Sequence, residues 1–103
     1  VLDLLPRQTD LVRDRRFAHD RAALLAARGS GDLLIEDDLE RHGVPPDLVR
    51  AAVEALEPES VRAALIVGAR GTSPRTARYL AGKGFSEASL ESIIADLATN
   101  ELG

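Results

Sequence analysis

The sequence predicts an all-α protein built from tandem three-helix repeats that form an elongated, curved helical array. Three observations support this prediction. Apolar residues make up 45% of the 103-residue chain and are mostly Ala and Leu, the apolar residues that favour helices most strongly. The few β-branched residues never alternate with polar residues over the length of a strand. The third observation is an internal repeat with a period of about 40 residues.

Two pairs of segments show this repeat. LLAARGS at 24–30 matches IVGARGT at 66–72 with an offset of 42 residues, and the segment 39–56 matches 80–97 with an offset of 41. The positions that stay apolar in both copies are Val44 with Phe85, Val49 with Leu90, Val53 with Ile94, and Leu56 with Leu97. Surface positions differ between the copies, so what the copies share is a plan of helix packing.

The repeat divides the chain into three parts. We expect residues 1–10 to be the tail of a preceding repeat or a linker, 11–57 to be the first three-helix repeat, and 58–103 to be the second. The chain begins with Val and contains no Met. We therefore expect the start codon to lie upstream and the chain to be part of a longer protein.

Start and stop signals predict three helices in the first repeat, at about 14–28, 30–42 and 46–56. Asp14 is the expected cap of the first helix, and Phe17 is expected to anchor it in the core. Ser30 is expected to open the second helix. Glycine follows the first two helices, and Pro46 suits the first turn of the third.

The second repeat shows the same signals. We expect helices at about 58–70, 73–84 and from 86 onward. Gly71 and Gly84 end the first two, Ser73 followed by Pro74 is a cap followed by proline at the first helical position, and Ser86 caps the last. The last helix carries Leu90, Ile93, Ile94 and Leu97 at helical spacing.

The composition excludes several kinds of site. Without cysteine there is no disulfide and no Cys-ligated metal site. No apolar run approaches the roughly 20 residues that span a bilayer, and no signal peptide is visible, so a cytoplasmic location is expected. His19 and His42 lack metal-ligand spacing, and the adjacent Asp37 and Asp38 point apart on a helix. We therefore expect no enzyme activity, cofactor, metal or small-molecule ligand, and instead binding to a macromolecule.

Charge is unevenly distributed, although the net charge is only −4. The stretch 60–86 contains five basic residues and no acid, a second basic group lies near the N-terminus, and 31–60 contains nine acids. We predict that a partner binds the basic side chains Arg62, Arg70, Arg75, Arg78, Lys83, Arg21 and Arg28. The alternative is an adaptor module that binds an ordinary protein through the acidic face.

A third interpretation concerns the segment 76–94, which imitates a helix-turn-helix. The second helix of such a motif reads DNA with basic or amide side chains near its N-terminus. Here those positions hold Glu87, Ser89 and Glu91. A weak DNA-binding domain therefore remains the least favoured alternative.

Residues 11–44, LVRDRRFAHDRAALLAARGSGDLLIEDDLERHGV, resemble the central repeat of the RecX regulators of the RecA recombinase. The matching residues are Asp14, Arg16, Phe17, Ala18, Gly29, Gly31, Ile35, Leu39, Gly43 and Val44. The segment 76–94 resembles the closing segment of the same family, so that the likeness covers about nine-tenths of the chain. RecX proteins usually have three repeats, so the resemblance implies that the first is missing here.

The resemblance also implies a function. Proteins of this family lie in the helical groove of the RecA–DNA filament and lower strand exchange and ATP turnover without chemistry of their own. It implies a monomer that acts in homologous recombination, DNA repair and the SOS response. Ala23, Leu25 and Leu34 stand where the family commonly has basic residues. Any direct contact with single-stranded DNA is therefore expected to be weak and salt-sensitive.

Overall fold

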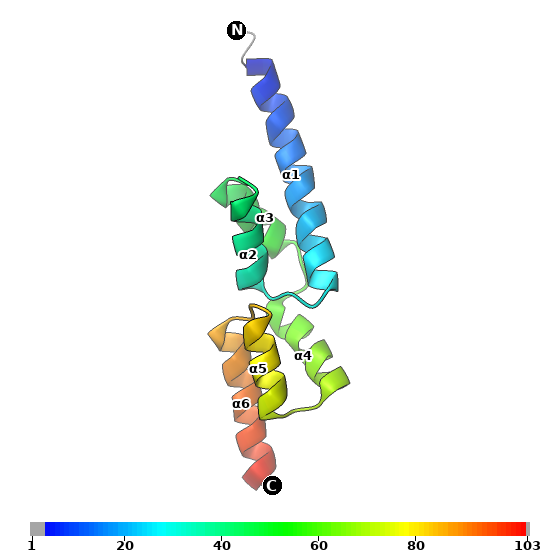
Figure 1. Cartoon of the computed structure of the whole chain (residues 1–103), viewed down its shortest axis with the longest axis vertical. Helices are drawn as coiled ribbons and strands as arrows, with labels where there is room; N and C mark the ends of the chain where they lie inside the picture. The colour runs from blue at the N-terminus through cyan, green and yellow to red at the C-terminus, as the bar shows by residue number, and fades with distance from the viewer. Residues whose placement is uncertain (1–3, 103) are drawn as a thin grey trace.

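The computed structural model describes residues 4–102, and over that range its regular secondary structure consists of helices joined by short loops, which confirms the predicted all-α class. Its elements are α1 (Leu4–Ala27), α2 (Asp32–Arg41), α3 (Pro46–Glu54), α4 (Glu59–Arg70), α5 (Pro74–Gly82) and α6 (Glu87–Leu102). The molecule is elongated, with extents of 68 × 19 × 17 Å. Two groups of three helices are stacked end to end, with the N-terminal part of α1 and the C-terminal part of α6 projecting at opposite ends (Figure 1).

Helices α1, α2 and α3 contact one another and form the first bundle. Ala18 and Ala22 on α1 are fully buried, and side chains this small let the neighbouring helices approach closely. The complete core is Ala18, Ala22, Leu25, Ile35, Leu39, Val44, Leu48, Val49 and Ala52. This bundle therefore contains most of the buried apolar residues that the structure describes.

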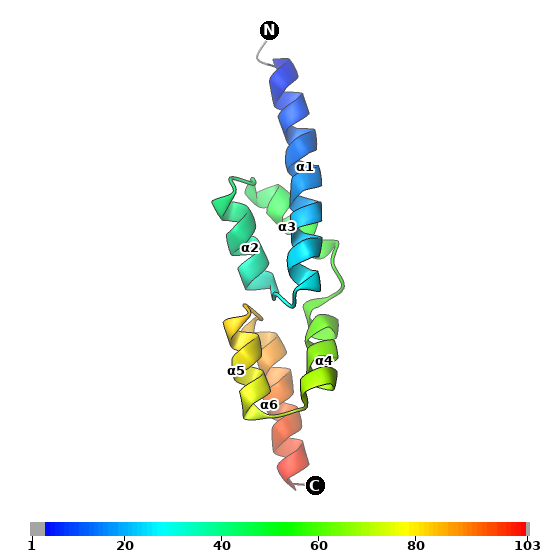
Figure 2. The same ribbon diagram turned by 45° about the vertical axis from the view of Figure 1, so that its right-hand side comes forward.

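The second bundle, formed by α4, α5 and α6, has the smaller core of Ala63, Leu80, Phe85 and Ile93. Val44 and Phe85, predicted to occupy equivalent positions, are both buried, at 5% and 2% exposure. A rotated view shows the two bundles in the same stacked order (Figure 2). That the bundles are copies of one repeat stays a prediction.

Helix α1 differs from its sequence prediction in two ways. It begins by Leu4, because Pro6 is tolerated in a first turn and no breaker follows before Gly29. The helix runs without a break across residues 10 and 11, and Asp14 lies inside it and does not cap it. The prediction for residues 1–3 lies outside the described residues.

The predicted core role of Phe17 is wrong. Its side chain is 40% exposed, because the buried face of α1 runs through Ala18, Ala22 and Leu25 and each residue turns a helix by about 100°. The ring of Phe17 instead contacts that of His42, the C-cap of α2, with centroids 5.4 Å apart.

Several helix ends follow the signals predicted from the sequence. The backbone turns at positive φ at the four predicted stops, Gly29, Gly43, Gly71 and Gly84. Ser73 caps α5 by accepting a 3.2 Å hydrogen bond from the amide of Thr76. Ser30 does not open α2 as predicted: the helix begins at Asp32 with Gly31 as its N-cap, and Ser30 is buried before it. In α6, Ile94 is 55% exposed, and the side chain of Leu97 lies outside the described residues.

Close backbone contacts join the two bundles. The amide of Gly31 donates to the carbonyl of Lys83 at 2.7 Å, and the amide of Leu33 donates to the carbonyl of Gly84 at 3.0 Å. A Cβ on Gly31 would lie 2.4 Å from the amide nitrogen of Phe85, far inside van der Waals contact. The α1–α2 loop and the α5–α6 loop thus meet backbone to backbone, and Gly31 is required there for space.

Candidate functional site

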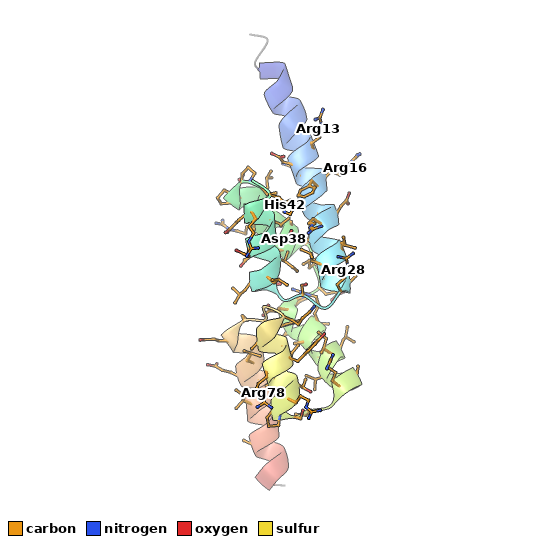
Figure 3. The ribbon with its side chains drawn as sticks, in the orientation of Figure 1. Arg13, Arg16, Arg28, Asp38, His42 and Arg78 are labelled. Carbon is orange, nitrogen blue, oxygen red and sulfur yellow. The ribbon has the colours of Figure 1, made fainter. Side chains whose placement is uncertain are left out.

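The start of α5 places two arginines on the surface. Ser73 and Pro74 fix the first turn, and the buried Thr76 and Leu80 turn one face of the helix inward. Arg75 and Arg78 lie on the same helix and are both exposed. Because residues three apart share one face of a helix, their side chains lie on the same side of α5. Arg78 is labelled on α5 in Figure 3.

A third arginine comes from the end of α4. Gly71, at a φ of 92°, turns the chain directly after Arg70 and brings its side chain beside α5. The Arg70 guanidinium carbon lies 3.5 Å from the centroid of the Tyr79 ring, which is a close cation–π contact. Tyr79 itself is half-buried and packs against the second core. The aromatic ring beneath Arg70 is therefore held by the core of the second bundle.

These arginines line one depression with a volume of about 560 Å³, together with polar side chains at the start of α5. The complete lining is Arg70, Ser73, Pro74, Arg75, Thr76 and Arg78. None of the three guanidinium groups forms an ion pair with a carboxylate that the structure describes. Three uncompensated cations around one hollow create a positive potential that attracts anionic groups.

The other predicted site residues lie elsewhere. Arg21 is engaged within the first bundle, where Nε and Nη2 donate to Asp38 on α2 at 2.8 and 2.9 Å. This bidentate pair lowers the pKa of Asp38, chiefly through the hydrogen bond from Arg21. Arg28 is exposed at the end of α1 (Figure 3). Lys83 is half-buried at the junction, where its carbonyl accepts the Gly31 hydrogen bond.

Arg62 has a structural position that the sequence did not indicate. Its guanidinium crosses from α4 to the first bundle, pairs with the carboxylate of Asp32, and donates to the carbonyl of Ser30 at 2.9 Å. Nε donates to the carbonyl of Glu57 at 2.9 Å. Because the side chain is only 10% exposed, these internal partners occupy most of its hydrogen-bonding capacity. Arg62 therefore lies apart from the exposed arginines around the depression.

Glu59 stands at the same junction and was not singled out from the sequence. One carboxylate oxygen accepts from the amide of Asp32 at 2.7 Å, and the other accepts from the Ser86 amide at 3.0 Å, the Ser86 hydroxyl at 2.5 Å and the Ser89 hydroxyl at 2.7 Å. This carboxylate thus satisfies donors at the start of α2 and the start of α6. The signal in the sequence was an acid directly after Pro58 at the repeat boundary, but its partners are 27 to 30 residues away.

Burial and hydrogen bonding oppose each other at this junction. Burial alone would raise the pKa of Glu59, but the hydrogen bonds from Ser86, Asp32 and Ser89 outweigh burial and lower it. For Asp32 the balance is reversed: burial raises its pKa, and the bond with Arg62 offsets only part of the rise. Glu59 is therefore held as the charged acceptor on which both helix starts depend.

The helix-turn-helix interpretation gains no base-reading side chain from the structure. Ser86 and Ser89 both donate their hydroxyls to Glu59, and Ser89 is buried. Over residues 87–91, at the start of α6, the exposed side chains are Glu87, Ala88 and Glu91. Two of these three carry the charge that nucleic acid repels.

Two further observations concern metal binding and membrane insertion. The described residues contain no group of three or more His, Cys, Asp or Glu side chains that could hold a metal ion. Within the same part of the chain, no helix combines the length and the apolar character needed to cross a bilayer. In comparisons with known proteins, no family model, no curated protein and no solved structure matches the chain.

Proposed function

We propose that this protein is a non-enzymatic regulator of the RecX type, which binds the filament that a RecA recombinase forms on single-stranded DNA and lowers its ATP turnover. The observation that carries the proposal is the arginine-lined depression. Arg70, Arg75 and Arg78 surround it without a described carboxylate as partner. Exposed cations at the start of a helix oppose the helix dipole slightly, so an anionic partner gives them a role that stability does not.

The shape of the molecule supports a filament as the partner. The chain is more than three times longer than it is wide, and end-to-end stacking of helical units presents an extended surface. Arg13, Arg16 and Arg28 lie along α1 in the first bundle, and Arg78 marks the depression in the second (Figure 3). A long partner with repeating negative charge can therefore contact both bundles at once.

Polar side chains of the types that act in catalysis form structural hydrogen bonds and ion pairs in this protein. Asp38 accepts from Arg21, and its backbone carbonyl lies 2.7 Å from Nδ1 of His42. Glu59 and Arg62 join the bundles. These assignments favour a binding protein, for which we propose a cytoplasmic monomer without a cofactor, metal or small-molecule ligand, acting in recombination, DNA repair and the SOS response.

The test is co-sedimentation with recombinase–single-stranded-DNA filaments, together with their ATP hydrolysis. The parent protein should co-sediment and lower ATP hydrolysis. The double reversal R75E/R78E should weaken binding about tenfold at low salt, because two favourable ion pairs become repulsive. The loss should shrink at high salt, where exposed charges are screened within a few ångströms.

The matched control is R41E/R50E, which makes the same change in net charge at two exposed arginines on α2 and α3, outside the depression and away from the arginines of α1. Both double variants should melt within a few degrees of the parent, because substitutions at exposed sites usually change stability by less than about 0.5 kcal/mol. Unchanged filament ATPase at a large excess of the parent protein would contradict the proposed function. Equal binding by R75E/R78E and the parent would exclude the depression as the contact.

One observation favours a second candidate, a protein-binding adaptor. Exposed acids, including Asp37, Glu40, Asp47 and Glu54, gather on α2 and α3. If R75E/R78E retains full binding and reversal of Asp47 and Glu54 to Lys abolishes it, the adaptor interpretation replaces the basic-face mechanism.

A further inference from the structure

The contact between Arg70 and Tyr79 gives the depression a feature that charge alone does not require. A guanidinium that binds a carboxylate offers it the N–H groups along its edge. Arg70 also has a neighbour on one face: its guanidinium carbon lies over the Tyr79 ring, 3.5 Å from the ring centroid. One flat face is covered by Tyr79, while the side chain remains exposed and lines the depression.

A flat, delocalised cation placed in this way is a stacking surface. Nucleobases that are not paired stack on guanidinium planes as well as on aromatic rings, and every base has a π-face to offer. A carboxylate of an acidic protein has no comparable surface. The position of Arg70 over Tyr79 therefore offers a base a stacking surface, in addition to the edge N–H groups that would serve a carboxylate.

The remaining lining fits the rest of a nucleotide. Arg75 and Arg78 stand one turn apart on the same face of α5 and carry positive charge for phosphate groups. The hydroxyls of Ser73 and Thr76, which also line the hollow, are hydrogen-bonded to each other. The volume of about 560 Å³ lies within the range of about 300–1,000 Å³ that is typical of small-ligand sites. No described carboxylate lines the depression to repel a phosphate.

We propose that this depression is a subsite for single-stranded nucleic acid, in which one base stacks on the free face of Arg70 and the flanking phosphates contact Arg75 and Arg78. This inference deepens the proposed function, because it identifies the exposed strand and not an acidic loop of the recombinase as the group held by the depression. Double-stranded nucleic acid is excluded as a ligand of this kind, since its bases are already stacked on one another.

The chain provides its own probe for this contact. Tyr79 is the only tyrosine, and there is no tryptophan, so tyrosine fluorescence reports on the platform beneath Arg70. The titration uses free short oligo(dT), oligo(rU) of equal length, and an abasic deoxyribose-phosphate oligomer that carries the same charge without bases. The parent should bind oligo(dT) about tenfold more tightly than the abasic oligomer, as expected for one stacked base, and oligo(dT) should change the fluorescence of Tyr79. The RNA arm shows which sugar the site prefers.

The decisive variant is R70K, which keeps the positive charge and removes the planar stacking surface. It should lose about tenfold in affinity for oligo(dT) and none for the abasic oligomer, whereas R75E/R78E should weaken both. R50K, the same change at an exposed arginine on α3, is the control and should bind like the parent. Equal affinity of the parent for the two DNA oligomers, or full oligo(dT) affinity in R70K, overturns the inference.

Because recombinase is absent from this titration, its outcome is separate from the filament test. Filament binding that depends on Arg75 and Arg78, without any preference for bases, would overturn the stacking subsite and leave the proposed function standing. Base-dependent binding without any effect on filament ATPase would support the stacking subsite and contradict the proposed function.

Discussion

Substitution of Gly31 by Ala tests whether the backbone contact at the junction holds the two bundles together. The φ of Gly31 is −85°, a value that any L-residue adopts, so alanine introduces no backbone strain there. The added Cβ would lie 2.4 Å from the amide nitrogen of Phe85 and 2.5 Å from the carbonyl carbon and oxygen of Gly84. These are backbone atoms and cannot rotate away, so the two loops must move apart by about 1 Å to reach van der Waals contact.

The cost follows from the bonds that this movement breaks. The hydrogen bonds from Gly31 to Lys83 and from Leu33 to Gly84 contribute about 1 kcal/mol each, and the bond from the Asp32 amide to the Glu59 carboxylate about 1.5–3 kcal/mol. We therefore expect G31A to lower the free energy of unfolding by about 3.5–5 kcal/mol. The loss should fall mainly on the second bundle, which has the smaller core.

The assay is urea unfolding followed by helical circular dichroism, with small-angle scattering to detect separation of the bundles. The control is G68A on α4, where an added Cβ has no neighbour within 4 Å. In a helix interior this change should stabilise the protein by about 0.5–1 kcal/mol. A G31A protein whose unfolding free energy lies within about 1 kcal/mol of the parent would refute the role assigned to the junction.

Two further predictions follow from the same structure. E59Q should lower the free energy of unfolding by about 2 kcal/mol at neutral pH, because it removes charge-assisted hydrogen bonds. E57Q, at an exposed neighbouring position, should change the free energy of unfolding little. Because the folded-state pKa of Glu59 is lowered, its contribution is present above the unfolded carboxyl pKa and is lost as the pH falls through the folded value. Urea midpoints of E59Q and the parent should therefore converge in acid, and a constant gap would contradict this assignment. F17A should lower the free energy of unfolding by well below the 2–5 kcal/mol or so expected for L39A, because Phe17 is 40% exposed and Leu39 is fully buried. Equal losses of stability for the two variants in thermal unfolding would contradict the exposed position of Phe17.

Local signals in the sequence were sufficient for the helices and their stops. Glycine at Gly43 and Gly84 and the Ser73–Pro74 pair each act within one or two turns of chain, and the structure confirms all three. The prediction was wrong for Asp14 and Phe17, where a cap and a core anchor were expected. Both residues lie inside a helix that continues through the expected boundary, and which of its faces is buried depends on the neighbouring helices.

The candidate site was only partly predictable. The absence of acids between 60 and 86 indicated a basic surface, but composition could not separate Arg62, held by Asp32 at the junction, from the exposed Arg75 and Arg78. The stacking of Arg70 on Tyr79 joins two helices across a turn, and no sequence spacing specifies it.

The sequence by itself determined the all-α class, the positions of most helix ends and the basic character of the second bundle, because each depends on propensity, capping or charge over short stretches of chain. Only the tertiary structure decided which cations remain available to a partner. Glu59 and Arg62 find partners about 30 residues away, and the loops at Gly31 and Gly84 meet only after both bundles have formed. Such pairings depend on distance in space, which local sequence patterns do not encode.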